Sequence, residues 1–309
     1  MKEECKFSTT RSAAIWFDDG NVILQAENKK FRVHKSILAL HSPIMNDMFM
    51  LGKPDADMGS DSVEDGCPVV EMKDDSASEW EELLSLIYHG YRVTRPNEAL
   101  SFVQISAMLR LGHKYCFKPY RQEALERFVD AFGSDWDTVV INDEGDIDTD
   151  KMRMDDAHSW SDVVNLAFDL RIRQSLPLVC FNAIAHKDYP SYLFEGTEEQ
   201  KRHRLARSIL TSSDNFSVLR AASIYDTCEG EDCQGALTAC IDRTYAPKLD
   251  VAKGLMIWDD IDSDGLCDRC KEAAQTDFEA SRDTLWIALP SVFGLPPWNA
   301  LDGGHEVED

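Results

Sequence analysis

The chain has 309 residues, enough for about two domains, and its 43% hydrophobic content is sufficient to form buried cores. Its formal net charge at pH 7 is −24, which argues against binding to nucleic acid, because a phosphate backbone needs Lys and Arg to replace its counterions. The same charge argues against anionic membrane surfaces. We therefore expect no nucleic-acid partner and no membrane partner.

The cellular compartment is indicated by the N-terminus and the cysteines. The opening sequence MKEECKFSTT carries charges where a secretory signal needs an apolar core. The longest uncharged run, residues 284–301, contains three prolines and would not continue as a helix across a bilayer. Nine cysteines are an odd number without a secretory signal, which indicates reduced thiols. We expect a cytoplasmic or nuclear protein.

The first predicted elements lie between Gly20 and Phe49. Alternating apolar residues predict a strand over residues 22–26 and a return strand over residues 31–34, joined by a polar turn. Apolar residues at helical spacing then predict two short helices. Between them, Ser42-Pro43 places a proline at the first position of the second helix.

The next segment, residues 52–66, is acidic and contains glycine, so we expect a mobile loop inserted before a third strand at residues 69–72. Three helices follow, each closed by a glycine. We expect them to start after a capping box at Ser76–Glu79, at about Asn97 and at Pro119, and to end at Gly90, Gly112 and Gly133.

The second half is expected to be a mainly α-helical domain over residues 158–301. It follows an acidic linker, residues 134–157, whose charges repel one another and leave little to bury. A capping box at Thr197–Gln200 starts one of its helices. The apolar segment Trp286–Trp298 is expected to fold back onto this domain, kept extended by its prolines. An acidic tail, residues 302–309, ends the chain. Apolar stripes at helical spacing recur around residues 160–167, 233–241 and 278–289.

Four cysteines form the main candidate site. Cys228-x4-Cys233 and Cys267-x2-Cys270 supply two close pairs of thiolates, which suit a tetrahedral zinc ion. The second pair has the spacing typical of zinc sites, and the first is wider. The alternative is that these residues are small hydrophobic residues, because Cys233 shares an apolar helix stripe with Leu237. The hypothesis is a structural zinc that ties the Cys228 segment to the final helix.

Two other kinds of site are weakly indicated. Asp260-x-Asp262-x-Asp264 resembles the start of a calcium loop, but the final bidentate ligand position holds Lys271, so a capped acidic turn is favoured. No metalloprotease, serine-hydrolase, phosphate-loop or dinucleotide motif is present, and no catalytic or cofactor-binding residue is predicted.

The segment Gly20–Phe49 resembles the BTB/POZ domain, and the resemblance extends over residues 12–133. The family pattern F-x-V-H-K/R-x-x-L-A-x-x-S is matched without a gap, with Met45 at a position where the family usually has an aromatic residue. The matching positions are Phe31, Val33, His34, Lys35, Leu38, Ala39, Ser42 and Phe49. The C-terminal half resembles a type common in fungal BTB proteins. The residues that carry this second resemblance are Cys267, Cys270, Trp286, Leu289, Pro290 and Phe293–Trp298.

The resemblance implies an α+β N-terminal domain, a small sheet flanked by helices, that binds other proteins and often itself. It implies that His34 packs against the core rather than acting as a base. Some family members are substrate adaptors of a cullin-type ubiquitin ligase, and others act in transcription. Two features depart from the dimeric members: Asn21 stands in place of the acid that would pair with Lys35, and few residues precede the strand at 22–26, which leaves little chain for a strand exchanged between protomers.

Two rival interpretations remain. One is an enzyme or ligand-binding protein with a site in the helical half, near Cys228, Cys267 and Trp286. The other is a zinc module that only braces that half.

Overall fold

The computed structural model describes residues 9–51, 63–93, 98–133, 140–141, 147–148, 151–155, 157–185, 228, 233–245, 255, 258 and 261–301. The chain forms two compact units. Unit 1 comprises Met1–Phe128 and Asp150–Asp155, and unit 2 comprises Val129–Thr149 and Asp156–Asp309. Most of the predicted acidic insertion, the Thr197–Gln200 box and the acidic tail lie outside the described residues.

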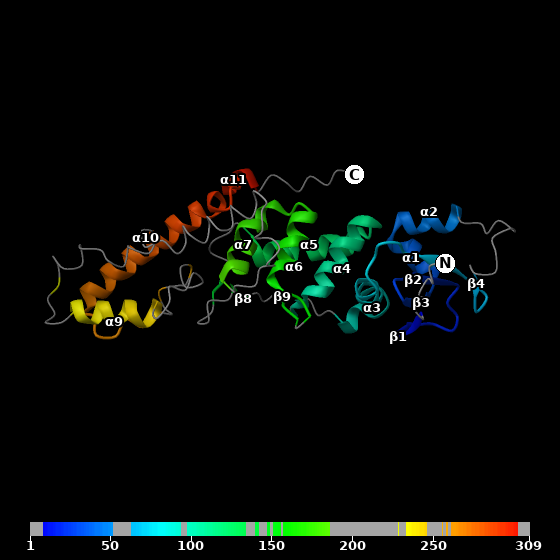
Figure 1. Ribbon diagram of the computed structural model, residues 1–309, viewed down its shortest axis with the longest axis horizontal. Coiled ribbons are helices and arrows are strands. Elements are labelled where there is room, and N and C mark those ends of the chain that lie inside the picture. Colours follow the sequence, from blue (N-terminus) through cyan, green and yellow to red (C-terminus); the bar gives the residue numbers. More distant parts are fainter. Residues whose placement is uncertain are drawn as a thin grey trace, which may run out of the picture. The chain divides into compact units, whose positions relative to one another are not determined.

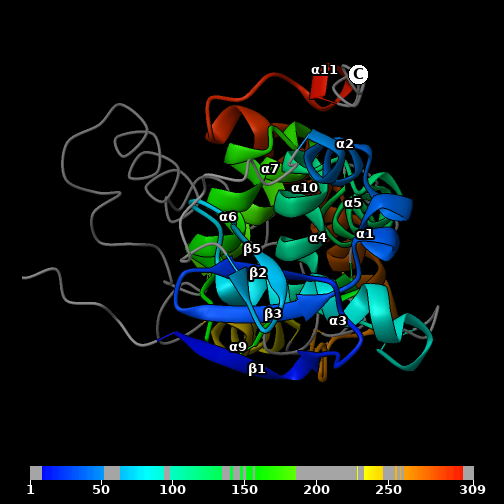
Figure 2. The ribbon, with the colours of Figure 1, turned by 90° about the vertical axis from the view of Figure 1, so that its right-hand side faces the viewer.

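Unit 1 contains a five-stranded sheet in the order β1-β3-β2-β5-β4, and Figure 2 shows β1, β3 and β2 side by side. Strands β2 and β3 form the predicted antiparallel hairpin, with Val22 opposite Val33 and Ala26 opposite Lys29. Strand β5 adds in parallel to the other side of β2. The strands are β1 (Thr10–Trp16), β2 (Val22–Ala26), β3 (Lys29–Val33), β4 (Val63–Glu64) and β5 (Cys67–Glu71).

The strand β1 was missed by the sequence analysis, which placed the first strand at residue 22. Thr10–Trp16 pairs in parallel with β3 of its own chain, with a register shift between Arg11 and Trp16. Only Ser12, Ile15 and part of Trp16 turn inward, so the strand lacks the alternation of period two that marks a half-buried strand. The residues before β2 are therefore sufficient for a full strand, and that strand pairs within its own chain.

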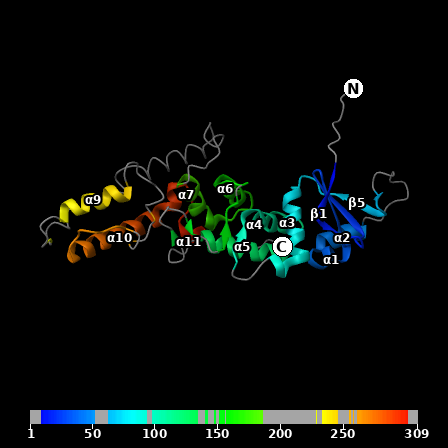
Figure 3. The same ribbon diagram turned by 90° about the horizontal axis from the view of Figure 1, so that it is seen from below.

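The helices of unit 1 enclose a core that includes Leu24, Phe31 and Trp80, all fully buried. Figure 3 shows α1 and α2 next to each other beside the strands. A short parallel pair, β6 (Leu100–Ser101) with β9 (Met152–Arg153), also belongs to this unit. The helices are α1 (Lys35–His41), α2 (Pro43–Leu51), α3 (Ala77–Val93), α4 (Phe102–Lys114) and α5 (Lys118–Phe132), and the division between the units falls inside α5.

Two predicted helix ends were wrong. Gly90 lies inside α3 and Gly112 lies inside α4. A Cβ atom at Gly112 would lie 2.8 Å from Cβ of Arg121, so this glycine permits the close approach of α4 and α5 rather than ending a helix. The capping box that starts α4 is formed by Ser101 and Gln104.

Unit 2 is mainly helical, as predicted, and α6 packs against α7 within it (Figure 1). Strands β7 and β8 form a small antiparallel pair, and they and β9 lie in the range predicted as a linker. Among the described residues, no helix combines the length and the apolar character needed to cross a bilayer. The elements are β7 (Val140–Ile141), β8 (Ile147–Asp148), α6 (Trp160–Asp169), the 3-10 turn η3 (Arg173–Ser175), α7 (Leu176–Ala185), α9 (Cys233–Tyr245), α10 (Asp268–Val292) and α11 (Trp298–Leu301).

The segment after α10 folds back, as expected. Trp298 stacks on Trp286, with ring centroids 4.5 Å apart, and its indole Nε1 donates a hydrogen bond to the Trp286 carbonyl at 2.8 Å. The expectation that Pro290 keeps this segment extended was wrong, because Pro290 lies inside the last turn of α10. Its carbonyl accepts hydrogen bonds from the N–H groups of Phe293 and Leu295, and Gly294 adopts a positive φ of 68° that closes the helix.

Candidate functional site

The junction of α1 and α2 is held by Ser42. Its hydroxyl donates to the Tyr115 carbonyl at 2.5 Å and accepts from the Met45 N–H at 3.0 Å. Leu38 and Met45 are fully buried on either side of it. One side of both helices is thereby fixed in the core, and the opposite side is turned to solvent.

That outer side carries four large hydrophobic residues, here called the α1–α2 apolar surface: Leu40, Ile44, Met50 and Leu51. Leu40 is 80% exposed, Met50 71% and Leu51 85%, and Ile44 is 39% exposed. Ile44 and Leu51 lie seven positions apart on α2 and so share one side of that helix. Large exposed apolar side chains on two helices that pack against each other are typical of a protein-binding surface.

Lys35 is the first residue of α1. Its backbone N–H donates to Asn21 Oδ1 at 2.8 Å, and its Nζ lies 5.8 Å from the centroid of the Phe49 ring on α2. Asn21 therefore fixes the start of α1.

His34 has the contacts of a structural residue. Tyr88 Oη accepts the His34 backbone N–H at 2.8 Å and lies 3.2 Å from His34 Nδ1. Phe17 stacks on Tyr88 with centroids 4.5 Å apart. Burial raises the pKa of Tyr88 above its ordinary value of 10.0, so the hydroxyl that contacts His34 is protonated at neutral pH.

A buried carboxylate, Asp75, was missed by the sequence analysis. Its Oδ2 accepts hydrogen bonds from Trp80 Nε1 at 3.0 Å and from the Tyr115 hydroxyl at 2.6 Å, and its Oδ1 pairs with Lys114 Nζ at 2.5 Å. Burial, reinforced by the Asp75 carboxylate, raises the pKa of Tyr115. The group ties α3 to the end of α4 and has no visible catalytic role. In the sequence Asp75 reads as part of a polar turn, so no pattern signals its burial.

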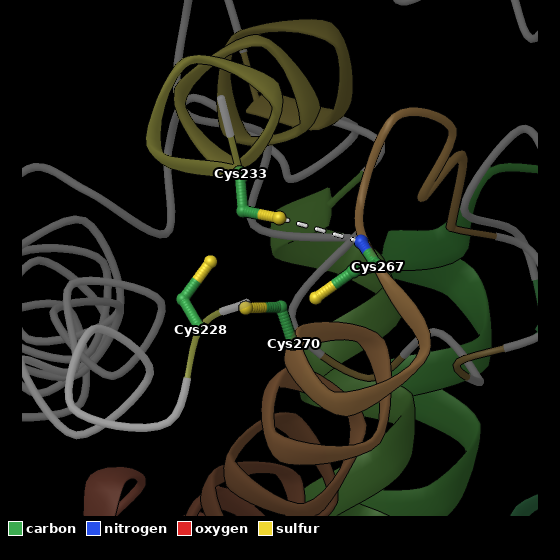
Figure 4. Close-up of side chains that lie close together, drawn as sticks. All are labelled: Cys228, Cys233, Cys267 and Cys270. Atoms are coloured by element: carbon green, nitrogen blue, oxygen red, sulfur yellow. Dashed lines mark hydrogen bonds between the residues drawn. The ribbon is translucent and has the colours of Figure 1, made fainter. Parts of the chain in front are cut away.

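The cysteine cluster, formed by Cys228, Cys233, Cys267 and Cys270, lies in unit 2. All four Sγ atoms lie within 4.8 Å of one another, and they converge on one point (Figure 4). Cys233 is the first residue of α9, Cys267 is the N-cap of α10 and Cys270 lies in its first turn. Cys233 and Cys270 are buried, the other two are half-buried, and none is in a disulfide.

The electrostatics of the cysteine cluster disfavour a free thiolate. Burial raises the pKa of the Cys270 thiol, and the neighbouring thiols raise it further. The N–H of Cys267, 3.4 Å from Cys233 Sγ, acts to lower the pKa of that thiol, but the adjacent Cys228 and Cys267 thiols and burial leave it raised. Cys233 and Cys270 therefore lack the lowered pKa of an activated nucleophile.

The other predicted site residues do not join this cluster. Trp286 is sixteen positions after Cys270 on the continuous helix α10, about 24 Å away at a rise of about 1.5 Å per residue. The prediction of a single site near both the cysteines and Trp286 was therefore wrong. Asp262 Oδ1 accepts the Asp264 N–H at 3.1 Å and its Oδ2 pairs with Arg243 Nε at 2.8 Å, as in a capped acidic turn. Asp260 lies outside the described residues.

Comparison with known proteins gives one family match. The family model described as BTB/POZ domain matches residues 17–129. No curated protein matches the chain. The family match confirms the resemblance that was read from Gly20–Phe49 and its extension towards residue 133. It does not reach the C-terminal half, where the resemblance to a fungal type stays a prediction.

Proposed function

We propose that this chain, which carries a BTB/POZ domain at residues 17–129, is a non-enzymatic adaptor that binds other proteins and associates with itself. BTB/POZ domains are interaction modules. The observation that supports self-association most directly is the α1–α2 apolar surface. In aqueous solution the large exposed side chains of that surface are stabilised by contact with a matching apolar surface, and a second copy of the same chain supplies one.

The size of the expected effect follows from the two most exposed leucines, Leu40 and Leu51. Burial of a leucine side chain contributes about 1.5–3 kcal/mol. Loss of both contacts in a dimer should therefore cost at least about 3 kcal/mol, or about a hundredfold in the dissociation constant. The net negative charge of the chain opposes association at low salt, so added salt should strengthen the dimer.

The test is light scattering of the full chain over a concentration series reaching tens of micromolar, an order-of-magnitude choice for weak interfaces. The Leu40→Glu/Leu51→Glu variant should be monomeric where the wild type is dimeric. Ile287→Glu is a matched control, because Ile287 is an equally exposed aliphatic residue (71%) on α10. A wild-type chain that remains monomeric throughout, or a dimer unaffected by the double substitution, would remove the proposal.

The rival proposal of an enzyme has less support. In the cysteine cluster the pKa values of Cys233 and Cys270 are raised, which favours the neutral thiol over the thiolate. His34 is engaged with Tyr88 and Phe17. No described residue is placed as an activated nucleophile by these contacts.

The setting of the adaptor is proposed to be the cytoplasm or nucleus. Its partner there is either a cullin, in a ubiquitin ligase, or a transcription complex. A pull-down with the N-terminal region of a cullin distinguishes the two. Retention of the wild-type chain supports the ligase role, and its absence from the bound fraction leaves the transcription role.

A further inference from the structure

We propose that the cysteine cluster binds one zinc ion as a closed, structural tetrathiolate site. Four thiolate donors with no other ligand type suit a tetrahedral zinc site, in which every coordination position is taken by protein. Such a site has no open position for water or substrate, so its role is to hold chain segments together. The proposal goes beyond the adaptor role, because it concerns unit 2 alone.

The distances fit this geometry. Zinc–sulfur bonds of about 2.3 Å place the four sulfurs of a tetrahedron about 3.8 Å apart. In the structure the Sγ atoms all lie within 4.8 Å of one another and point inward (Figure 4). A contraction of about 1 Å or less at each pair, within reach of side-chain rotation, is all that the ion requires.

The backbone around the cluster is arranged for negative sulfurs. Cys233 begins α9, and Cys267 and Cys270 lie at the start of α10, so two helix N-termini meet there. Each N-terminus carries a partial positive charge and N–H groups without a partner in the helix. One such group, the Cys267 N–H, already donates to Cys233 Sγ at 3.4 Å. A zinc ion with four thiolates has a net charge of −2, which this arrangement stabilises.

The position of the cluster shows what the ion would hold. Farther along, α9 contacts the segment that leads into α10, since Arg243 pairs with Asp262 and Ala236 approaches Gly265. Zinc at the cluster would fix the N-terminal end of α9 to the same segment. It would also hold Cys228, from the chain before α9. Cys228, the start of α9 and the start of α10 would thereby be held together.

A redox role for Cys267-x2-Cys270 is the competing chemistry, because a disulfide between these residues at a helix N-terminus is a known arrangement. One observation favours metal. The second pair, Cys228 and Cys233, is in place around the same point as Cys267 and Cys270, which a two-cysteine redox site does not require.

The experiment is metal analysis of the full chain purified without chelators, followed by X-ray absorption at the zinc edge. We expect close to one zinc per chain with four sulfur neighbours at about 2.3 Å. Cys270→Ser and Cys228→Ser should each lose most of the bound zinc. Cys240→Ala is the matched control, since Cys240 is a buried cysteine on the same helix as Cys233 and outside the cluster, and it should keep the metal.

A second readout guards against variants that fail to fold. Removal of zinc from the wild type with a strong chelator should increase hydrogen exchange in peptides from α9 and the start of α10, and should leave peptides from α3 and α4 unchanged. Three results would overturn the proposal: wild-type protein without zinc, a Cys267–Cys270 disulfide in the protein as purified under reducing conditions, or zinc retained with nitrogen or oxygen neighbours in the cysteine variants.

Discussion

Replacement of Asp75 by Ala should be among the most destabilising polar substitutions in the BTB/POZ domain. Asp75 is 7% exposed and is the acceptor for two buried donors, Trp80 Nε1 and the Tyr115 hydroxyl. A buried donor left without a partner costs about 1–3 kcal/mol, so the two together should cost about 2–6 kcal/mol. The total stability of a domain is about 5–15 kcal/mol, so this loss is a large share of it.

Lys114 should contribute less to the same group. Its side chain is 45% exposed, but it pairs with a carboxylate that is only 4% exposed, so its loss leaves a buried charge that only Trp80 and Tyr115 then hold. Lys114→Ala is therefore the comparison variant, with an expected cost of about 1–2 kcal/mol, below that of Asp75→Ala. In a Tyr115→Phe background one of the two donors is already absent, so Asp75→Ala should cost about 1–3 kcal/mol less there.

The assay is hydrogen exchange of the full chain in increasing urea, read on peptides from α3 and α4. Local reporters are needed because two units need not unfold in one step. If Asp75→Ala proves no more costly than Lys114→Ala, the buried acceptor is not a stabilising group and the reasoning is refuted.

Two further predictions concern unit 1. Gly112→Ala should destabilise the unit by about 1–3 kcal/mol, because the new Cβ would meet the backbone and Cβ of Arg121. Gly90→Ala should stabilise it by about 0.5–1 kcal/mol, because nothing lies within 4 Å of a Cβ at that position. Urea unfolding measures both changes, and equal effects would contradict the packing argument. Burial acts to raise the pKa of Glu81, but the hydrogen bond from Lys29 and its other partners lower it overall. A lowered folded pKa gives stability that is present above the ordinary value of 4.5 and is lost as the pH falls through the folded value. Acid titration should therefore destabilise the wild type more than Glu81→Gln, and parallel curves would show that the ion pair is not involved.

The elements that the sequence predicted well are those whose burial follows a simple period. Val22, Leu24 and Ala26 alternate as a strand does, and the hairpin with β3 formed as expected. Ile23 is equally buried, because β2 is covered on both faces, and this could not be read from the alternation alone. The strand β1 has no such period, and its place in the sheet depends on pairing with residues that come later in the chain.

The candidate sites also divide into those that the sequence indicates and those that depend on tertiary structure. The four cysteines were named from their spacing, but their convergence depends on where α9 begins relative to α10, which is tertiary information. Asp75 and Gly112 carry no local signal at all. Each has its role because of a partner from another element, Tyr115 at the end of α4 in one case and Arg121 on α5 in the other.

The position of β1 determines where a truncated fragment of the chain should begin. β1 is an edge strand of the sheet and pairs with the outer side of β3. The hydroxyl of Ser12 on β1 donates a hydrogen bond to Glu81 at 2.7 Å. A fragment that begins at residue 17, where the family match begins, would lack it. The exposed edge of β3 would then pair with strands of other chains. Such a fragment should aggregate under conditions in which a fragment beginning at Thr9 does not.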